Sequence, residues 1–194
     1  AAALSASNVA LGSQNVYVEE KGAFTGETSY AMLKDTSCTY AIIGHSERRH
    51  VMGETDAMIN QKISAAISGG LLPIFCVGEL LEEREANQTE DVVARQIDAV
   101  INLVGISAFK DVVIAYEPVW AIGTGLVPSN DDIKSIHANL RAKTSKPLLY
   151  GGSVKVTNMK EIVEIDNVDG VLVGGASLYA EHFCEMIKIA EETF

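Results

Sequence analysis

Short apolar runs of strand length alternate along the chain with longer segments in which apolar positions recur at helical spacing. The apolar runs predict strands at Val9–Leu11, Tyr40–Ile43, Leu71–Val77, Val112–Tyr116, Leu148–Tyr150 and Val171–Val173. The segments between and after them predict helices at Ser29–Lys34, Asp56–Ser68, Glu90–Val104, Asp131–Ala142, Asn158–Ile165 and Leu178–Ala190. This alternation indicates an α/β fold with a parallel sheet covered by helices. The pattern fits a doubly wound sheet and a closed (β/α) barrel equally well.

The length of 194 residues, without a visible linker, predicts one domain over residues 1–194. No apolar run reaches the ~18 residues of a membrane span, and the first residues lack the basic and apolar regions of a secretion signal. We therefore expect no membrane partner and a cytoplasmic location. The formal charge of −11 disfavours nucleic acid as a partner. Three widely spaced cysteines without a CxxC pair favour neither a disulfide framework nor a zinc site.

A carboxylate stands where one buried strand ends, in the stretch AYEPVWAIGTG (115–125). Pro118 biases Glu117 toward an extended backbone, which ends the strand and directs the carboxylate. The apolar residues that follow run into glycines that let the backbone approach a ligand closely. The segment Trp120–Gly125, called the lid below, therefore resembles a hinged cover over a site at Glu117. The structural alternative is a strand followed by a capped turn with a buried tryptophan.

A histidine occupies the same kind of position after another strand. The tetrad Gly44-His45-Ser46-Glu47 follows Ala41–Ile43 directly, and Ser46 is a candidate N-cap for a short helix whose amide dipoles would favour a neutral imidazole. A lone histidine is more often structural than catalytic. Ligand sites of parallel α/β folds collect at the C-terminal ends of strands, where both His45 and Glu117 are predicted to lie.

Two glycine-rich turns follow the last two predicted strands, at Tyr150–Val154 and Val173–Ser177. Each can offer backbone N–H groups to an anion, and two in successive β/α units resemble the phosphate site of (β/α)8 barrels. The structural alternative for either one is a tight connection between a strand and a helix.

Taken together, these motifs resemble the triosephosphate isomerase family over nearly the whole chain. The matching segments are Gly12–Asn15, Gly22–Glu27, Ile43–Arg49, Cys76–Glu79, Ala115–Gly125, Tyr150–Val154 and Asp169–Ser177. The resemblance implies a (β/α)8 barrel, here units three to eight. It also implies that Glu117 is the catalytic base and His45 the electrophile, and that Gly123, Ser153, Gly174 and Gly175 hold the substrate phosphate.

The implied reaction interconverts dihydroxyacetone phosphate and glyceraldehyde 3-phosphate, with no cofactor and no metal. Triosephosphate isomerase is itself the standard example of a glutamate base paired with a neutral histidine. The family also implies a homodimer, in which the apolar tip Ala23-Phe24-Thr25 inserts into a neighbouring subunit.

One departure leaves an alternative open. The family's first strand carries an Asn and a Lys that reach the substrate, and nothing before Val9 matches it, so we expect an N-terminally shortened chain. The alternative to an active isomerase is therefore a non-catalytic or weakly active barrel fragment. Another phosphate-binding barrel enzyme, such as an aldolase, would place a Schiff-base lysine or paired carboxylates at strand ends, and the sequence shows neither.

Overall fold

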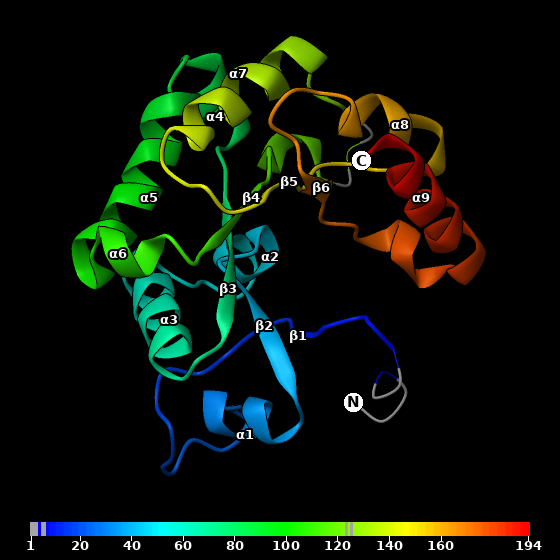
Figure 1. The fold of residues 1–194 in the computed structure, drawn as a ribbon. Coiled ribbons are helices and arrows are strands. Elements are labelled where there is room, and N and C mark those ends of the chain that lie inside the picture. Colours follow the sequence, from blue (N-terminus) through cyan, green and yellow to red (C-terminus); the bar gives the residue numbers. More distant parts are fainter. Residues whose placement is uncertain (1–3, 5–6, 123, 125) are drawn as a thin grey trace. The chain divides into compact units, whose positions relative to one another are not determined.

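The computed structural model describes residues 4, 7–122, 124 and 126–194 (Figure 1). The chain forms two compact units. The first unit comprises residues 1–76 and 96–113, and the second comprises residues 77–95 and 114–194. The single domain expected over residues 1–194 stays a prediction, because each unit is compact by itself.

The first unit holds three parallel strands that are neighbours in sequence order: β1 (Leu11–Ser13), β2 (Cys38–Ile43) and β3 (Leu72–Val77). Only the last residue of β3 belongs to the second unit. The helices of this unit are α1 (Tyr30–Asp35), α2 (Ser46–His50), α3 (Asp56–Ser68), α6 (Ile106–Phe109) and the C-terminal half of α5 (Thr89–Val104). Strand and helix alternate from β1 to α3, as the apolar pattern predicts.

Helix α3 shows why the local sequence forms these elements. Its N-cap is Thr55, whose hydroxyl oxygen accepts a hydrogen bond from the Met58 amide at 3.3 Å. Ile59 and Ile63 recur one turn apart and are fully buried, which stabilises the unit by about 1.5–3 kcal/mol for each side chain. Gly70, with φ +72°, turns the chain out of the helix and into β3.

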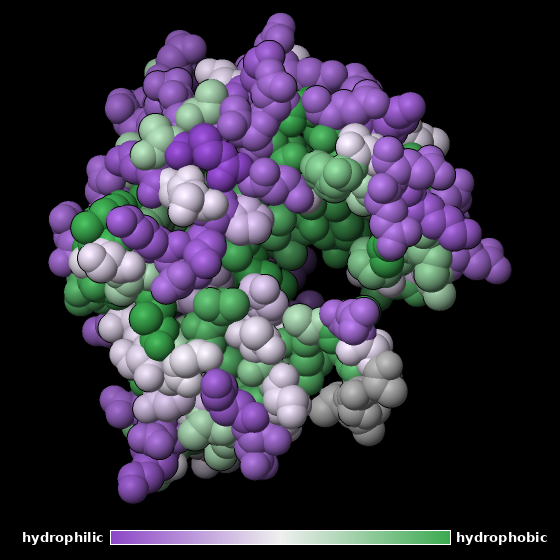
Figure 2. All heavy atoms as spheres, viewed as in Figure 1, coloured by the Kyte–Doolittle hydropathy of each residue, from purple (hydrophilic) through white to green (hydrophobic). Residues whose placement is uncertain are grey.

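The second unit repeats the arrangement with β4 (Val113–Tyr116), β5 (Leu148–Tyr150) and β6 (Gly170–Val171), again parallel and in sequence order. Only the first residue of β4 belongs to the first unit. Its helices are α4 (Leu81–Glu85), the N-terminal part of α5, α7 (Asn130–Arg141), α8 (Val156–Val163) and α9 (Ala180–Thr193). Two 3-10 helices, η2 (Val119–Ala121) and η3 (Gly175–Leu178), follow β4 and β6. Hydrophilic residues cover α7 in the view of Figure 2.

The predicted alternation is confirmed, with shifts at the edges of elements. Strand β1 begins at Leu11 rather than Val9, and β6 ends at Val171 rather than Val173. Helix α2 is the short helix expected after His45, and α4 contains the charged stretch Glu82–Glu85, which indicates a solvated helix face. The short helix α6 has no counterpart among the predictions, because it spans too few residues to show a helical period. Among the described residues, no helix is long and apolar enough to cross a membrane.

Candidate active site

Glu117 follows the last residue of β4 and is held on both sides by the neighbouring strand ends. Its backbone N–H donates to the carbonyl oxygen of Val77, the last residue of β3, at 2.7 Å. The carbonyl oxygen of Tyr116 accepts from the Gly151 amide, just beyond β5, at 2.7 Å. Only 2% of Glu117 is exposed. The carboxylate therefore leaves a fixed backbone at the C-terminal end of a buried strand.

Glycines just beyond the ends of β3 and β5 make room for this residue. A β-carbon on Gly78 would lie 1.7 Å from the Glu117 carbonyl oxygen, far inside any van der Waals contact. A β-carbon on Gly151 would lie 2.8 Å from Cγ of Glu117. The glycine at each position therefore follows from the close approach of Glu117.

A second carboxylate anchors the first residue of the lid. Glu79 is fully buried, and its Oε1 accepts from the indole Nε1 of Trp120 at 2.8 Å. The Tyr116 hydroxyl donates to both Glu79 oxygens at 3.2 Å. Burial raises the pKa of Glu79 above its usual range, and the hydrogen bonds from Trp120 and Tyr116 oppose this shift. Sequence reasoning missed Glu79, although it follows the end of β3 as Glu117 follows the end of β4.

Further contacts hold the lid and the residues that flank it. The Ser153 hydroxyl donates to the Ala121 carbonyl oxygen at 2.9 Å. The Thr124 hydroxyl donates to the Trp120 carbonyl oxygen at 3.0 Å and accepts from the Leu126 amide at 3.2 Å. Gly123, which the sequence assigns to phosphate binding, lies outside the described residues. Ser153 thus has a side-chain role in holding the lid that its predicted phosphate role does not include.

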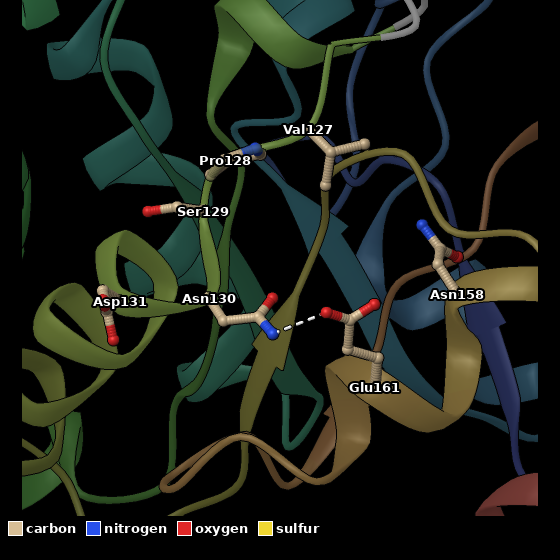
Figure 3. A pocket seen from close by; sticks show the side chains of 7 residues that line it. All are labelled: Val127, Pro128, Ser129, Asn130, Asp131, Asn158 and Glu161. Carbon is tan, nitrogen blue, oxygen red and sulfur yellow. Dashed lines mark hydrogen bonds between the residues drawn. The ribbon is translucent and has the colours of Figure 1, made fainter.

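A groove of about 480 Å³ lies where the chain leaves the lid and enters α7. Its lining comes from residues 127–131 and from Asn158 and Glu161 of α8. Figure 3 shows Asn130 and Glu161 pointing toward each other across it, joined by a hydrogen bond of 2.7 Å. Glu117 and Ser153 do not line this groove, so it is separate from the strand-end positions predicted for catalysis.

The two glycine turns leave adjacent strands. Tyr150 of β5 pairs with Val171 of β6, and the Leu172 amide donates to the Tyr150 carbonyl oxygen at 2.9 Å. Gly174 and Gly175 are exposed, and Gly175 begins η3. The turn after β6 therefore presents backbone next to the turn that carries Ser153. A single 3-10 turn, η3, precedes α9, which begins two residues after the predicted start at Leu178.

In the first unit, His45 follows β2 and caps α2. The prediction that Ser46 is the N-cap is wrong: Ser46 is the first helical residue, and His45 occupies the cap. Imidazole Nδ1 can accept a hydrogen bond as a hydroxyl oxygen can, and it accepts one from the Glu47 amide at 3.3 Å. Burial lowers the pKa of His45, and the Glu47 carboxylate opposes that shift. The lowered pKa and the amide bond to Nδ1 both favour a neutral imidazole.

Arg49 fixes the backbone in front of this histidine. Its Nε donates to the Gly44 carbonyl oxygen at 2.7 Å and an Nη donates to the Cys76 carbonyl oxygen at 3.2 Å. Gly44 has φ +78°, and a β-carbon there would lie 3.1 Å from Arg49 and from Ile59. One guanidinium thus joins the ends of β2 and β3 and sets the turn that leads into His45.

Parallel strands in sequence order, with candidate groups at their C-terminal ends, define the chain as a protein of the (β/α)-barrel class. A family model for triosephosphate isomerase matches residues 1–190. The triosephosphate isomerase of Hydrogenovibrio crunogenus is 50% identical over 199 aligned residues, which cover 97% of this chain and 79% of that protein. That of Thiobacillus denitrificans is 48% identical over 197 residues, covering 97% and 79%. The triosephosphate isomerase of Sulfurimonas denitrificans is 50% identical over 188 residues, covering 96% and 77%.

The chain belongs to the triosephosphate isomerase family. Family membership confirms the expected fold class, since the described strands correspond to part of a (β/α)8 barrel. It also confirms the chain as an isomerase and favours this interpretation over a non-catalytic fragment.

Proposed function

We propose that Glu117 is the base that moves a proton between the two carbons of a triose phosphate. The observation that carries this proposal is the carboxylate's position: it is buried at the end of β4, on a backbone fixed from both sides, with space reserved by Gly78 and Gly151. A carboxylate so placed can take a proton from a carbon beside a carbonyl and return it to the neighbouring carbon. The substrates are dihydroxyacetone phosphate and glyceraldehyde 3-phosphate.

His45 is the proposed electrophile. Because Nδ1 accepts from the Glu47 amide, the proton of the neutral ring lies on Nε2. An Nε2–H group can donate to the substrate's carbonyl oxygen and stabilise the negative charge that builds there. The lowered pKa of His45 supports this role, because a neutral ring polarises the oxygen without transferring a proton to it outright.

Backbone amides are the proposed phosphate ligands, at Ser153, Gly174, Gly175 and Gly123. The turns after β5 and β6 are adjacent, and Gly174 and Gly175 carry no side chain that would keep a phosphate away from the backbone. Neutral N–H groups suit a chain with a formal charge of −11, because they bind an anion without requiring a cationic side chain. The Gly123 assignment rests on the family resemblance alone.

We also propose a homodimer in the cytoplasm. Phe24 is 42% exposed at the tip of a loop, and its ring packs against the Tyr17 ring with 4.8 Å between the centroids. This exposed apolar tip supports its insertion into a second copy of the chain. The cysteines at positions 38, 76 and 184 are all free thiols, as a reducing compartment allows. Sedimentation at micromolar concentration tests the dimer, and a monomer would contradict it.

Hydrogen exchange tests the proposed base. Incubated with dihydroxyacetone phosphate in D2O, the protein is expected to place deuterium on the substrate carbon that exchanges its proton, as seen by NMR. Glu117→Gln keeps the shape of the side chain but cannot accept the proton, so the exchange rate should fall by about 10²–10⁴-fold. Glu85→Gln, an exposed residue on α4, is the matched control and should exchange at the parent rate. Equal exchange by Glu117→Gln and the parent would refute the assignment.

A further inference from the structure

An arginine on α4 contacts both the first residue of the lid and a residue that follows the lid in the chain. The guanidinium carbon of Arg84 lies 4.4 Å from the centroid of the Trp120 ring, within the range of a cation–π contact. An Nη of the same group donates to Oδ2 of Asp132 at 2.8 Å. Trp120 is the first residue of the lid, whereas Asp132 lies in the first turn of α7, beyond the lid's far end.

Asp132 is itself tied to the start of α7. Its Oδ2 accepts from the Ser129 hydroxyl at 2.7 Å and from the Ser129 amide at 3.2 Å, and its own amide donates to the Ser129 hydroxyl oxygen. This capping box fixes the first turn of the helix. The Arg84 side chain is only 29% exposed, so solvent screens its interactions less than those of a fully exposed arginine.

We propose that Arg84 is a positioning residue for the lid: it holds Trp120 against Glu79 and ties that position to the start of α7. This rests on the proposed function and on the prediction that Trp120–Gly125 covers the site at Glu117. A guanidinium is planar and directional, so it can stack on an indole while one edge binds a carboxylate. With its guanidinium bound to Asp132, Arg84 loses the stack when Trp120 moves away from Glu79 unless the ion pair also breaks. Arg84 therefore favours the Trp120 position that the structure shows and limits how often the lid departs from it.

The chain offers a direct probe, because Trp120 is its single tryptophan. Quenching of intrinsic fluorescence by acrylamide measures how often this indole is released from its contacts, without any turnover of substrate. Arg84→Ala is expected to raise the quenching constant about two- to fivefold, the range that corresponds to loss of one cation–π contact near a surface. Arg84→Gln should raise it nearly as much, since glutamine keeps a polar side chain but carries no positive charge for the indole face or for Asp132.

Two further variants separate this role from a general loss of charge or of structure. Arg95→Ala removes a mostly exposed arginine on α5, and its quenching constant should equal that of the parent. Asp132→Asn keeps an oxygen for the Ser129 cap and loses the ion pair with Arg84. Its quenching constant is expected to rise by less than that of Arg84→Ala. Because both changes break the same connection, Arg84→Ala with Asp132→Asn should quench no faster than Arg84→Ala alone.

The proposal is overturned if Arg84→Ala quenches as the parent does, if Arg95→Ala gives the same rise, or if the effects of Arg84→Ala and Asp132→Asn are additive. Should Arg84→Ala fail to fold by circular dichroism, Arg84→Gln becomes the deciding variant, and parent-like quenching in it refutes the proposed contact. Absence of isomerase activity in the parent, with the expected rise in quenching of Arg84→Ala, would contradict the proposed function instead. The two failures are therefore distinguishable.

Discussion

The backbone of Glu117 passes so close to Gly78 that a β-carbon on residue 78 would lie 1.7 Å from the Glu117 carbonyl oxygen. The contact joins the chain just after β3 to the chain just after β4, and the hydrogen bond from the Glu117 amide to Val77 accompanies it. Any side chain at position 78 must therefore displace the backbone that carries the proposed base.

Gly78→Ala is expected to destabilise the protein by about 3 kcal/mol and to lower isomerase activity, because the clash is with backbone atoms that cannot rotate away. Urea unfolding and a standard isomerase assay measure the two effects. Gly12→Ala is the control, since its new β-carbon would meet Tyr40 at an ordinary 3.4 Å. Its stability should lie within about 1 kcal/mol of the parent. Parent-like stability and activity in Gly78→Ala would contradict the close approach.

His137 makes stability depend on pH. This residue of α7 is fully buried, its Nδ1 lies 3.0 Å from the Asn167 carbonyl oxygen, and burial lowers its pKa below the ordinary 6.5. Below pH 6.5 the unfolded chain takes up a proton that the folded chain resists. The contribution of His137 to the free energy of unfolding should therefore be constant above pH 6.5 and fall as the pH drops toward the folded pKa.

The measurement is urea unfolding at intervals below neutral pH. The contribution of His137 to the slope is at most about 1.4 kcal/mol per pH unit. His137→Phe keeps a ring edge-on to Tyr116 but cannot titrate, so its stability should fall less steeply with acid than that of the parent. His45, whose pKa is also lowered, contributes to the slope of both proteins alike. Identical slopes of the free energy of unfolding against pH in the parent and His137→Phe would refute the assignment to His137.

A buried ion pair stabilises the first unit through Glu54 and Lys62. Both side chains are about 95% buried, and Nζ of Lys62 lies 2.5 Å from Glu54 Oε1 and 2.8 Å from Asn15 Oδ1. Burial would raise the pKa of Glu54, but the bonds from Lys62 and Arg48 outweigh it and lower the pKa. The pair is therefore intact at neutral pH, and its contribution is lost as the pH falls below about 4.5.

Lys62→Met removes one of the two cations that pair with the buried Glu54 carboxylate. The free energy of unfolding, measured with urea at neutral pH, is expected to fall by about 3–5 kcal/mol. The deficit should shrink in acid, where Glu54 can be protonated. Lys160→Met breaks an exposed pair with Glu164 and serves as the control, with a cost of about 0–1 kcal/mol. A cost for Lys62→Met as small as that of the control would contradict this account.

Much of the fold could be predicted because the strands are continuous apolar runs. The run Leu71–Val77 predicted β3 to within one residue, and Leu148–Tyr150 predicted β5 without error. The prediction for β6 was displaced because the strand begins at Gly170, which lies before the apolar run Val171–Val173, and ends after the first residue of that run. The cap of α2 was wrongly given to Ser46 because imidazole is a rare N-cap acceptor, so the residue type favoured serine.

The candidate site could be predicted at the residues that end strands, and not at those that support them. Glu117 and His45 follow apolar runs, which marks their positions from sequence. Arg84 occurs in the charged stretch Glu82–Glu85, which indicates a solvated helix face, and only the structure places its guanidinium over Trp120. Contacts between residues 36 or 48 positions apart along the chain, such as that stack and the pair with Asp132, leave no periodic signal.

The kinetics of Glu117→Asp test the central claim, that the Glu117 carboxylate moves the proton, most directly. The change withdraws the carboxylate by one methylene and keeps its charge, so kcat should fall by about 10²-fold while KM stays within about threefold of the parent. Glu85→Asp makes the same change at an exposed position of α4 and should leave both constants unaltered. A Glu117→Asp protein with the parent's kcat would contradict the claim.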